Sequence, residues 1–402
     1  MRTVGTVLDS GRAVSAQVGV APGPVRRAGR RLGWIRTLTA GILLALVAMW
    51  VFGFVAFLAR ATRGSYEIVD FHFYYTAAQA VLHGRSPYLA LDDPTLGTKI
   101  AYVYPPLTAI VTTPFTLLPL HAAGALAVSL LAVTVVSTLY VLGVRDWRCY
   151  VLALSWRPVL FAILTGNLTV VLGLAAALAW RFRDRLLPVV SAVGLALAAK
   201  LFLWPLVVWL AATRRYAAAL LSCFLAVVVV LGSWAVIGFA GLLDYPRLLR
   251  RAQELQEHAT YTTYSLARDL GLPATLARGL GSVVALALLA GVVLLSRRGA
   301  SREAFVLAVA ASIGFSPIVW LHYFALLVVV VGVSRPTLGA AWFLPLAMWV
   351  APGVDGTPAA KIVVLAAAAL IMLVCVLPRR DSRTGYRRVR LDRMSVVHGS
   401  HT

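Results

Sequence analysis

The stretch from Ile35 to Leu58, IRTLTAGILLALVAMWVFGFVAFL, decides the fold class of this chain. As a helix it is long enough to cross the roughly 30 Å hydrocarbon core of a bilayer. It is longer than the apolar part of a secretory signal peptide and follows a long basic leader, so we interpret it as a retained membrane anchor. Arginines at its start predict a cytoplasmic N-terminal side and an outer loop after Leu58; they are Arg26, Arg27, Arg30, Arg31 and Arg36.

The composition of the whole chain also indicates a membrane protein. Of its 402 residues, 60% are apolar and 13% are charged, and the mean hydropathy is +0.85. The charged share is about half of that in soluble proteins, which excludes an ordinary cytosolic domain and predicts an all-α polytopic membrane protein. The net charge of +22 comes from arginines at the ends of apolar runs and in the two tails. That placement indicates cytoplasmic loops beside anionic membrane lipids, with no nucleic acid as partner.

The three cysteines, Cys149, Cys223 and Cys375, are far apart and lie in or beside apolar runs. Their spacing fits neither a disulfide framework nor a metal site. We interpret them as small apolar core residues.

Apolar runs bounded by arginines predict about twelve membrane segments, with both termini in the cytoplasm. We expect a disordered basic tail over residues 1–33, a membrane domain over 34–378 and a basic tail over 379–402. Two large outer loops are expected, at about residues 60–104 and 239–278. The segments after the first are expected at Tyr102–Pro119, His121–Val144, Cys149–Thr165, Leu168–Trp180, Leu186–Ala212, Tyr216–Ile237, Leu280–Leu295, Ala304–Ser316, Val319–Val333, Ala340–Val350 and Ile362–Leu377.

Two of these segments are not expected to cross the bilayer as single helices. Tyr102–Pro119 is short and bracketed by prolines, which favours a re-entrant or interfacial segment. Leu186–Ala212 has arginines on both sides, so one crossing cannot place both flanks in the cytoplasm. We therefore predict two half-depth helices that meet near Lys200, with a break favoured by Pro205.

The first outer loop contains SYEIVDFHFYYTAAQAVLHGRSPY, residues 65–88. Apolar residues at helical spacing predict a short amphipathic helix over Phe71–Leu82 that lies on the membrane surface. Asp70 occupies an N-cap position for this helix, and Gly84 occupies the C′ position.

Four polar residues fall at or near the outer ends of their predicted segments: Asp70, Asn167, Lys200 and His322. Lys200 and His322 stand in strongly apolar surroundings, where a cation is costly unless it faces a cavity or an anion. No carboxylate lies deep within an apolar run, which argues against a proton-driven carrier.

These residue types suggest a reaction at the outer membrane surface. Two cations suit a lipid-linked phosphate or pyrophosphate, whose charge they offset as a bond breaks. A carboxylate in an adjacent loop suits a general base for an acceptor hydroxyl. Together they indicate glycosyl transfer from a polyprenyl-phosphate sugar.

Five blocks of sequence resemble glycosyltransferase family 87 of the GT-C superfamily, and they occur in that family's order. They are D-F-x-x-Y-Y-x-A-A-x-A-x-x-x-G-x-x-P-Y (Asp70–Tyr88), Y-P-P (Tyr104–Pro106), G-N (Gly166–Asn167), G-L-x-L-A-x-K-x-x-x-x-P (Gly194–Pro205) and S-P-I-x-W-x-H (Ser316–His322). The chain looks like the actinobacterial polyprenyl-phosphate-mannose-dependent α-1,2-mannosyltransferases of phosphatidylinositol mannoside and lipoglycan synthesis.

The resemblance implies a GT-C type bundle in the inner (plasma) membrane, with its active site on the extracytoplasmic side. It implies that Asp70 is the catalytic base and that His322 lies beside the donor phosphate. The transfer would be inverting, from β-linked polyprenyl-phosphate-mannose to an α-linked product on a glycolipid acceptor, without a metal or cofactor.

Further residues are candidates for substrate binding. Lys200 is expected to contact the donor phosphate, and Asn167 a hydroxyl. Tyr74, Tyr75 and Tyr104 could stack on the sugar, and Arg268 in the second outer loop could contact the acceptor or a phosphate. Glu67, upstream of Asp70, is an alternative base or a substrate contact.

Each candidate has a structural alternative. Asp70 could serve only as a helix cap, and Lys200 could extend to the membrane surface. His322 could be a neutral core residue, and the tyrosines could be interfacial aromatic residues. At the level of function, the alternatives are a carrier or flippase for lipid-linked sugar, a transferase of arabinose or another sugar, and a non-catalytic scaffold.

Overall fold

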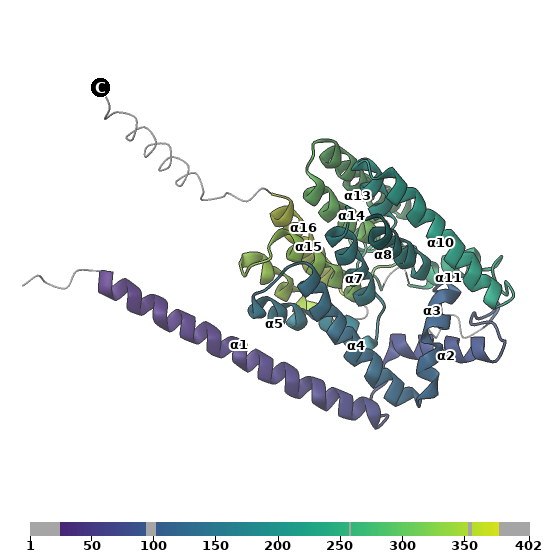
Figure 1. Cartoon of the computed structure of the whole chain (residues 1–402), viewed down its shortest axis with the longest axis horizontal. Helices are drawn as coiled ribbons and strands as arrows, with labels where there is room; N and C mark the ends of the chain where they lie inside the picture. Colours follow the sequence, from purple (N-terminus) through teal and green to yellow (C-terminus); the bar gives the residue numbers. More distant parts are fainter. Residues whose placement is uncertain (1–24, 94–101, 257–258, 353–355, 378–402) are drawn as a thin grey trace, which may run out of the picture. The chain divides into compact units, whose positions relative to one another are not determined.

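The computed structural model describes residues 25–93, 102–256, 259–352 and 356–377. The described residues contain helices and turns and no β-strand (Figure 1), which confirms the all-α expectation. The chain divides into two units, Met1–Met49 and Trp50–Thr402, and helix α1 (Val25–Thr62) runs through their boundary. Helix α1 begins before the expected end of the first tail at residue 33. The rest of that tail, residues 1–24, and residues 378–402 lie outside the described residues.

The second unit contains all the other helices of the described residues. Its α-helices are α2 (Val69–Leu82), α3 (Pro106–Thr112), α4 (Leu120–Val141), α5 (Trp147–Ser155), α6 (Arg157–Thr165), α7 (Thr169–Arg181), α8 (Leu186–Ala199), α9 (Pro205–Ala212), α10 (Tyr216–Val236), α11 (Tyr245–Gln256), α12 (Thr263–Asp269), α13 (Ala274–Arg297), α14 (Ser301–Gly314), α15 (Leu327–Ser334) and α16 (Pro358–Val376). Its 3-10 helices are η2 (Thr113–Leu117), η3 (Leu321–Leu326), η4 (Ala340–Trp342) and η5 (Leu344–Val350).

Five of the described helices are long and apolar enough to cross a membrane. They are the part of α1 from Ala40 to Thr62, α4, α10, α13 and α16. The pair α5 and α6 would add a sixth if it formed one bent span. The expected count of about twelve is not confirmed, because several expected segments form shorter helices, among them α7 and α8.

The segment expected as one helix over Cys149–Thr165 is broken. Helices α5 and α6 meet at Trp156 with a bend of 68°. Trp156 has extended backbone angles (φ −68°, ψ 128°), and Pro158 in the first turn of α6 has no N–H to continue α5. The Trp156 indole is buried and donates to the carbonyl of Trp342 at 3.0 Å, so packing fixes the bend.

The break predicted near Lys200 is confirmed. Helix α8 ends at Ala199, Lys200 is extended (φ −159°, ψ 120°), and α9 begins at Pro205. Helix α8 packs closely on α10 at Gly194, where a Cβ would lie 3.0 Å from the Ser222 carbonyl oxygen and 2.9 Å from Leu225.

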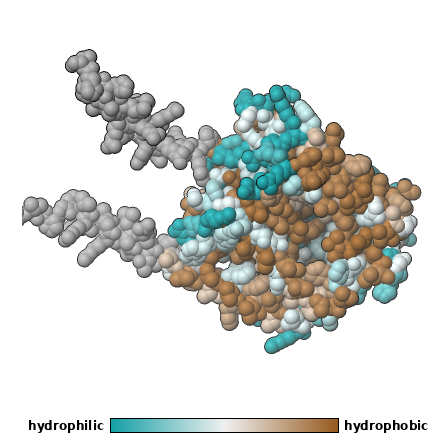
Figure 2. Space-filling view, viewed as in Figure 1, coloured by the Kyte–Doolittle hydropathy of each residue, from teal (hydrophilic) through white to brown (hydrophobic). Residues whose placement is uncertain are grey.

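The outward sides of α10 and α13 carry exposed apolar side chains, including Leu220, Phe224 and Val283. Figure 2 shows a broad apolar face, with hydrophilic side chains gathered at its upper edge over the ends of α13 and α14. Outward apolar residues beside a buried core are typical of a protein whose surroundings are lipid.

Candidate active site

Helix α2 carries Asp70 in its first turn. The N-cap residue is Ile68 and makes no side-chain cap bond, so the prediction that Asp70 caps the helix is wrong. The C′ prediction is confirmed: Gly84 has φ +65°, and the N–H groups of Gly84 and Arg85 donate to the carbonyls of Val81 (3.0 Å) and Ala80 (2.8 Å). Because the Asp70 carboxylate does not cap the helix, it is available to groups on other helices.

Asn167 is the direct partner of Asp70. Its Nδ2 donates to Asp70 Oδ2 at 3.1 Å, while its Oδ1 accepts from the backbone N–H (2.8 Å) and the hydroxyl (2.7 Å) of Thr169. These two bonds from Thr169 fix the amide so that its NH₂ group faces the carboxylate.

Gly166 allows α2 to approach Asn167 closely. Gly166 ends α6 with φ +76°, and a Cβ there would lie 2.6 Å from Phe71 Cβ and 2.9 Å from Ile68 Cγ2. Only glycine meets both requirements, the left-handed backbone and the lack of space. The two residues of the G-N pair therefore act together. Gly166 lets the first turn of α2 pack closely, and Asn167 hydrogen-bonds the Asp70 carboxylate on that turn.

Burial and hydrogen bonding act in opposite directions on Asp70. Burial raises the pKa of the Asp70 carboxyl above its usual range. Hydrogen bonds with Thr165 and Asn167 and the positive charge of Lys200 lower that pKa, but by less than burial raises it. The result is a carboxylate that is a stronger base than a solvated aspartate.

Lys200 lies among aromatic rings in the break between α8 and α9. Its Nζ bonds the Tyr323 hydroxyl and lies 4.0 Å from the centre of that ring. The ring centres of Tyr104 and Phe202 are 5.1 Å and 5.5 Å from the same nitrogen. Aromatic faces attract a cation while leaving part of it free for an anionic ligand.

His322 is buried at the start of η3, close enough to Lys200 to interact with it electrostatically. Its ring lies 5.9 Å from the ring centre of Phe161 and 5.0 Å from that of Tyr323. Neither ring nitrogen has a hydrogen-bond partner among the described residues. Buried polar atoms are nearly always hydrogen-bonded, so the His322 ring is available to bond a ligand.

Tyr74 and Tyr104 close the cluster. Their rings meet edge to face with centres 5.1 Å apart, and their hydroxyls are hydrogen-bonded to each other. The Tyr74 hydroxyl also accepts from the Leu168 N–H at 3.5 Å. The Tyr88 hydroxyl donates to the Tyr104 carbonyl at 2.9 Å and the Tyr88 ring stacks on Trp234, which connects the loop after α2 to α10.

A groove of about 700 Å³ reaches this cluster from the side of the bundle. It runs between α3, α4, α7 and α8, and the face in Figure 2 is hollowed in this region. Leucine, valine and alanine side chains form most of its walls, while Tyr74, Gly166 and Ala199 lie at the end beside Asp70 and Lys200. A groove of this shape and chemistry suits a long hydrocarbon chain.

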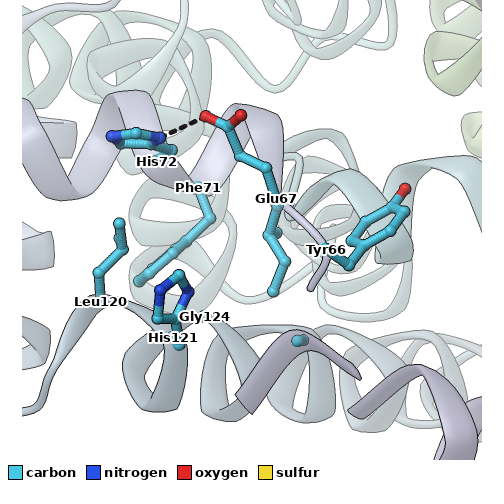
Figure 3. Close-up of a pocket in the computed structure, with 9 residues that line it drawn as sticks. Tyr66, Glu67, Phe71, His72, Leu120, His121 and Gly124 are labelled. Atoms are coloured by element: carbon cyan, nitrogen blue, oxygen red, sulfur yellow. Dashed lines mark hydrogen bonds and ion pairs between the residues drawn. The ribbon is translucent and has the colours of Figure 1, made fainter. Parts of the chain in front are cut away.

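The structure brings Asp70, Asn167, Lys200 and His322 together. Tyr74 and Tyr104 join them, but three other candidates do not. Figure 3 shows that Glu67 points to His72, with which it forms an exposed ion pair. The Tyr75 hydroxyl donates to the Leu118 carbonyl at 2.9 Å, and Arg268, at the end of α12, donates to the Leu272 carbonyl at 2.8 Å.

Two members of the cluster were not predicted from the sequence. Tyr323 bonds Lys200, and Thr165 bonds Asp70. Both are neighbours of predicted residues, since Tyr323 follows His322 and Thr165 precedes Gly166-Asn167. Their position beside a motif was the available sequence signal for Tyr323 and Thr165. In an apolar run this position does not distinguish a site residue from a core residue. The described residues contain no group of three or more His, Cys, Asp or Glu that could hold a metal ion.

Residues 102–321, more than half of the chain, match the model of glycosyltransferase family 87. The chain belongs to glycosyltransferase family 87. The matched region includes Tyr104, Asn167 and Lys200; Asp70 lies before it, and His322 is the residue after it.

One curated relative is the polyprenol-phosphate-mannose-dependent alpha-(1-2)-phosphatidylinositol mannoside mannosyltransferase of Mycobacterium tuberculosis (strain ATCC 25618 / H37Rv). It is 33% identical over 132 residues, which are 32% of this family 87 chain and 29% of the relative. The match thus spans less than a third of either protein. No solved structure matches the chain.

Proposed function

We propose that this family 87 protein transfers a mannosyl residue from a polyprenyl-phosphate donor to a glycolipid acceptor at the extracytoplasmic face of the inner membrane. The observation that carries the proposal is a basic carboxylate, Asp70, beside Lys200 and the buried His322 at the end of an apolar groove. The family match and the name of the partial relative support a lipid-linked sugar donor, with mannose as the sugar.

In this mechanism the polyprenyl tail lies in the groove and the sugar-phosphate head lies between Asp70 and Lys200. Asp70 removes the proton from the acceptor hydroxyl as its oxygen attacks C1 of the sugar. The C1–oxygen bond to phosphate breaks on the opposite side, so the configuration at C1 inverts. Lys200 offsets the charge of the departing lipid phosphate, and His322 donates a hydrogen bond to it from one ring nitrogen.

The test is transfer of radiolabelled mannose from polyprenyl-phosphate-mannose to glycolipids in membranes that contain the protein. Asp70→Asn should lose activity by about 100-fold or more, because it removes the proton acceptor and keeps the shape. Asp244→Asn is the matched control, since Asp244 is an exposed carboxylate in the second outer loop that pairs with Arg247. Near-normal transfer by Asp70→Asn would remove Asp70 from this role.

The same assay separates the alternatives. A carrier would move labelled donor across the bilayer without forming product, and it would tolerate Asp70→Asn. Donors that carry arabinofuranose or glucose test the sugar, and digestion of the product by an α-mannosidase tests the linkage. We expect product only from the mannose donor and its complete release by the α-mannosidase.

A further inference from the structure

A second cavity lies far from Asp70. Its volume is about 800 Å³, it is open to the surface, and it is bounded by the end of α9, the start of α10, the end of α13 and the start of α14. Tyr216, the first residue of α10, lines it, whereas Trp234 near the other end of α10 stacks on Tyr88 of the first outer loop. The 21 residues of α10 span about 30 Å, so the two sites are at opposite ends of the bundle.

The cavity is basic. Arg214, Arg215 and Arg297 line it, and of these only Arg215 has an ion pair among the described residues, with Asp184 at 2.6 Å. Ser296 also lines it, is 8% exposed, and has a hydroxyl without a hydrogen-bond partner in the described structure. Two unpaired guanidinium groups and an unsatisfied hydroxyl at one cavity point to an anionic ligand with several acceptor oxygens.

The backbone at Arg214 gives an independent observation. Arg214 is the C′ residue of α9 and has φ +63°, a left-handed conformation that is unfavourable for any residue with a Cβ. The N–H groups of Arg214 and Arg215 donate to the carbonyls of Ala211 and Leu210, each at 2.9 Å, which is the helix ending that glycine favours. Helices α2, α4, α10, α12 and α13 of this chain do place glycine there. The strained arginine therefore indicates a use for its side chain.

We propose that this cavity binds a phosphate-bearing anion through Arg214 and Arg297. The ligand chemistry is a phosphate monoester or diester, from the headgroup of an anionic phospholipid or from a soluble phosphate. Val208 and Val293 form apolar walls beside the arginines, which suits the glycerol and first acyl carbons of a lipid.

The test measures binding to the full-length protein in a non-ionic detergent by native mass spectrometry and by the shift in melting temperature. The probes are dioctanoyl phosphatidylglycerol, dioctanoyl phosphatidylcholine with the same tails, and sodium phosphate at matched ionic strength. The variants are Arg214→Gly and Arg297→Gln. Arg298→Gln is the control, because Arg298 is the next exposed arginine but does not line the cavity.

Wild type and Arg298→Gln should bind phosphatidylglycerol at least about tenfold more tightly than phosphatidylcholine, and both cavity variants should lose that preference. Arg214→Gly should melt without lipid at an unchanged or higher temperature, because glycine relieves the left-handed strain. That result excludes misfolding as the cause of lost binding.

Stabilisation by sodium phosphate as well would assign a soluble ligand, and stabilisation by phosphatidylglycerol alone would assign a lipid. Equal affinity for the two lipids without a phosphate effect, or affinity within twofold of wild type in both cavity variants, would overturn the proposal.

Discussion

At the scale of single residues, the raised pKa of Asp70 determines how activity should depend on pH. In the proposed mechanism Asp70 is the general base and acts only when ionised, so log(kcat/KM) should rise with pH until the carboxyl has lost its proton. Because burial raises this pKa, the acid limb should lie at higher pH than for a solvated aspartate. The measurement is a pH profile of mannosyl transfer in detergent. An acid limb at the pKa of an ordinary aspartate would contradict the assignment.

The same shift determines the sign of Asp70's effect on stability. The unfolded carboxyl, with its lower pKa, loses its proton first as pH rises, so stability falls between the unfolded and the folded pKa. Asp70→Asn removes this dependence. We therefore expect Asp70→Asn to melt at the wild-type temperature at low pH and above it near neutral pH. A lower melting temperature for Asp70→Asn at neutral pH would show that the charge stabilises the fold.

At the scale of elements, the contact of α2 with the end of α6 positions the Asp70 carboxylate. Substitution of Gly166 tests this contact, and substitution of Gly84 is the control. Both glycines have positive φ, +76° at Gly166 and +65° at Gly84, but a Cβ meets nothing within 4 Å at Gly84. Gly84→Ala should cost about 1–2 kcal/mol from backbone strain alone. Gly166→Ala adds the clash with Phe71 and Ile68, so it should cost more and displace Asp70 from Asn167.

The measurements are melting temperature and kcat for both glycine variants. We expect kcat to fall about tenfold or more for Gly166→Ala and to stay near wild type for Gly84→Ala, because misplacement of a catalytic group is costly. Similar kcat values for the two variants would show that the close approach of α2 to Gly166 does not matter for the reaction.

At the scale of the whole molecule, the groove predicts a dependence on lipid length. Ala192 of α8 lies half-buried in its wall, and Ala287 on the outer side of α13 is exposed away from it. Ala192→Trp should raise the KM for a long polyprenyl donor several-fold, because the indole occupies the path of the tail. The KM for a donor with a very short chain should stay at the wild-type value. Ala287→Trp should leave the KM for both donors unchanged. An equal effect on both donors would place the tail elsewhere.

A buried ion pair joins α12 to α16. Lys361 of α16 is 1% exposed and donates to Asp269 Oδ2 (2.6 Å) and Ser265 Oγ (2.7 Å) of α12. Asp269→Ala leaves the ammonium buried without its counter-charge, which should cost about 3–5 kcal/mol. Asp244→Ala, which breaks an exposed pair, should cost about 1 kcal/mol or less. The check is the melting temperature of each variant, and equal shifts would contradict the burial argument.

The sequence by itself determined what depends on local pattern and charge. The apolar runs fixed the all-α class, the arginines on both sides of Leu186–Ala212 with Pro205 located the break at Lys200, and Gly84 marked the end of α2. The predicted segment ends also assigned Asp70, Asn167, Lys200 and His322 to one side of the membrane, and the structure brings these four residues together.

Only the tertiary structure decided how those groups touch. The bend at Trp156 depends on packing against Trp342, and the contact of Asp70 with Asn167 depends on a helix ending that has no room for a Cβ. Tyr323 became part of the site because the break at Lys200 aims an ammonium at its ring. Contacts between residues about 100 positions apart leave no periodic trace in a sequence, since they arise from the shapes of helix surfaces that meet only after folding.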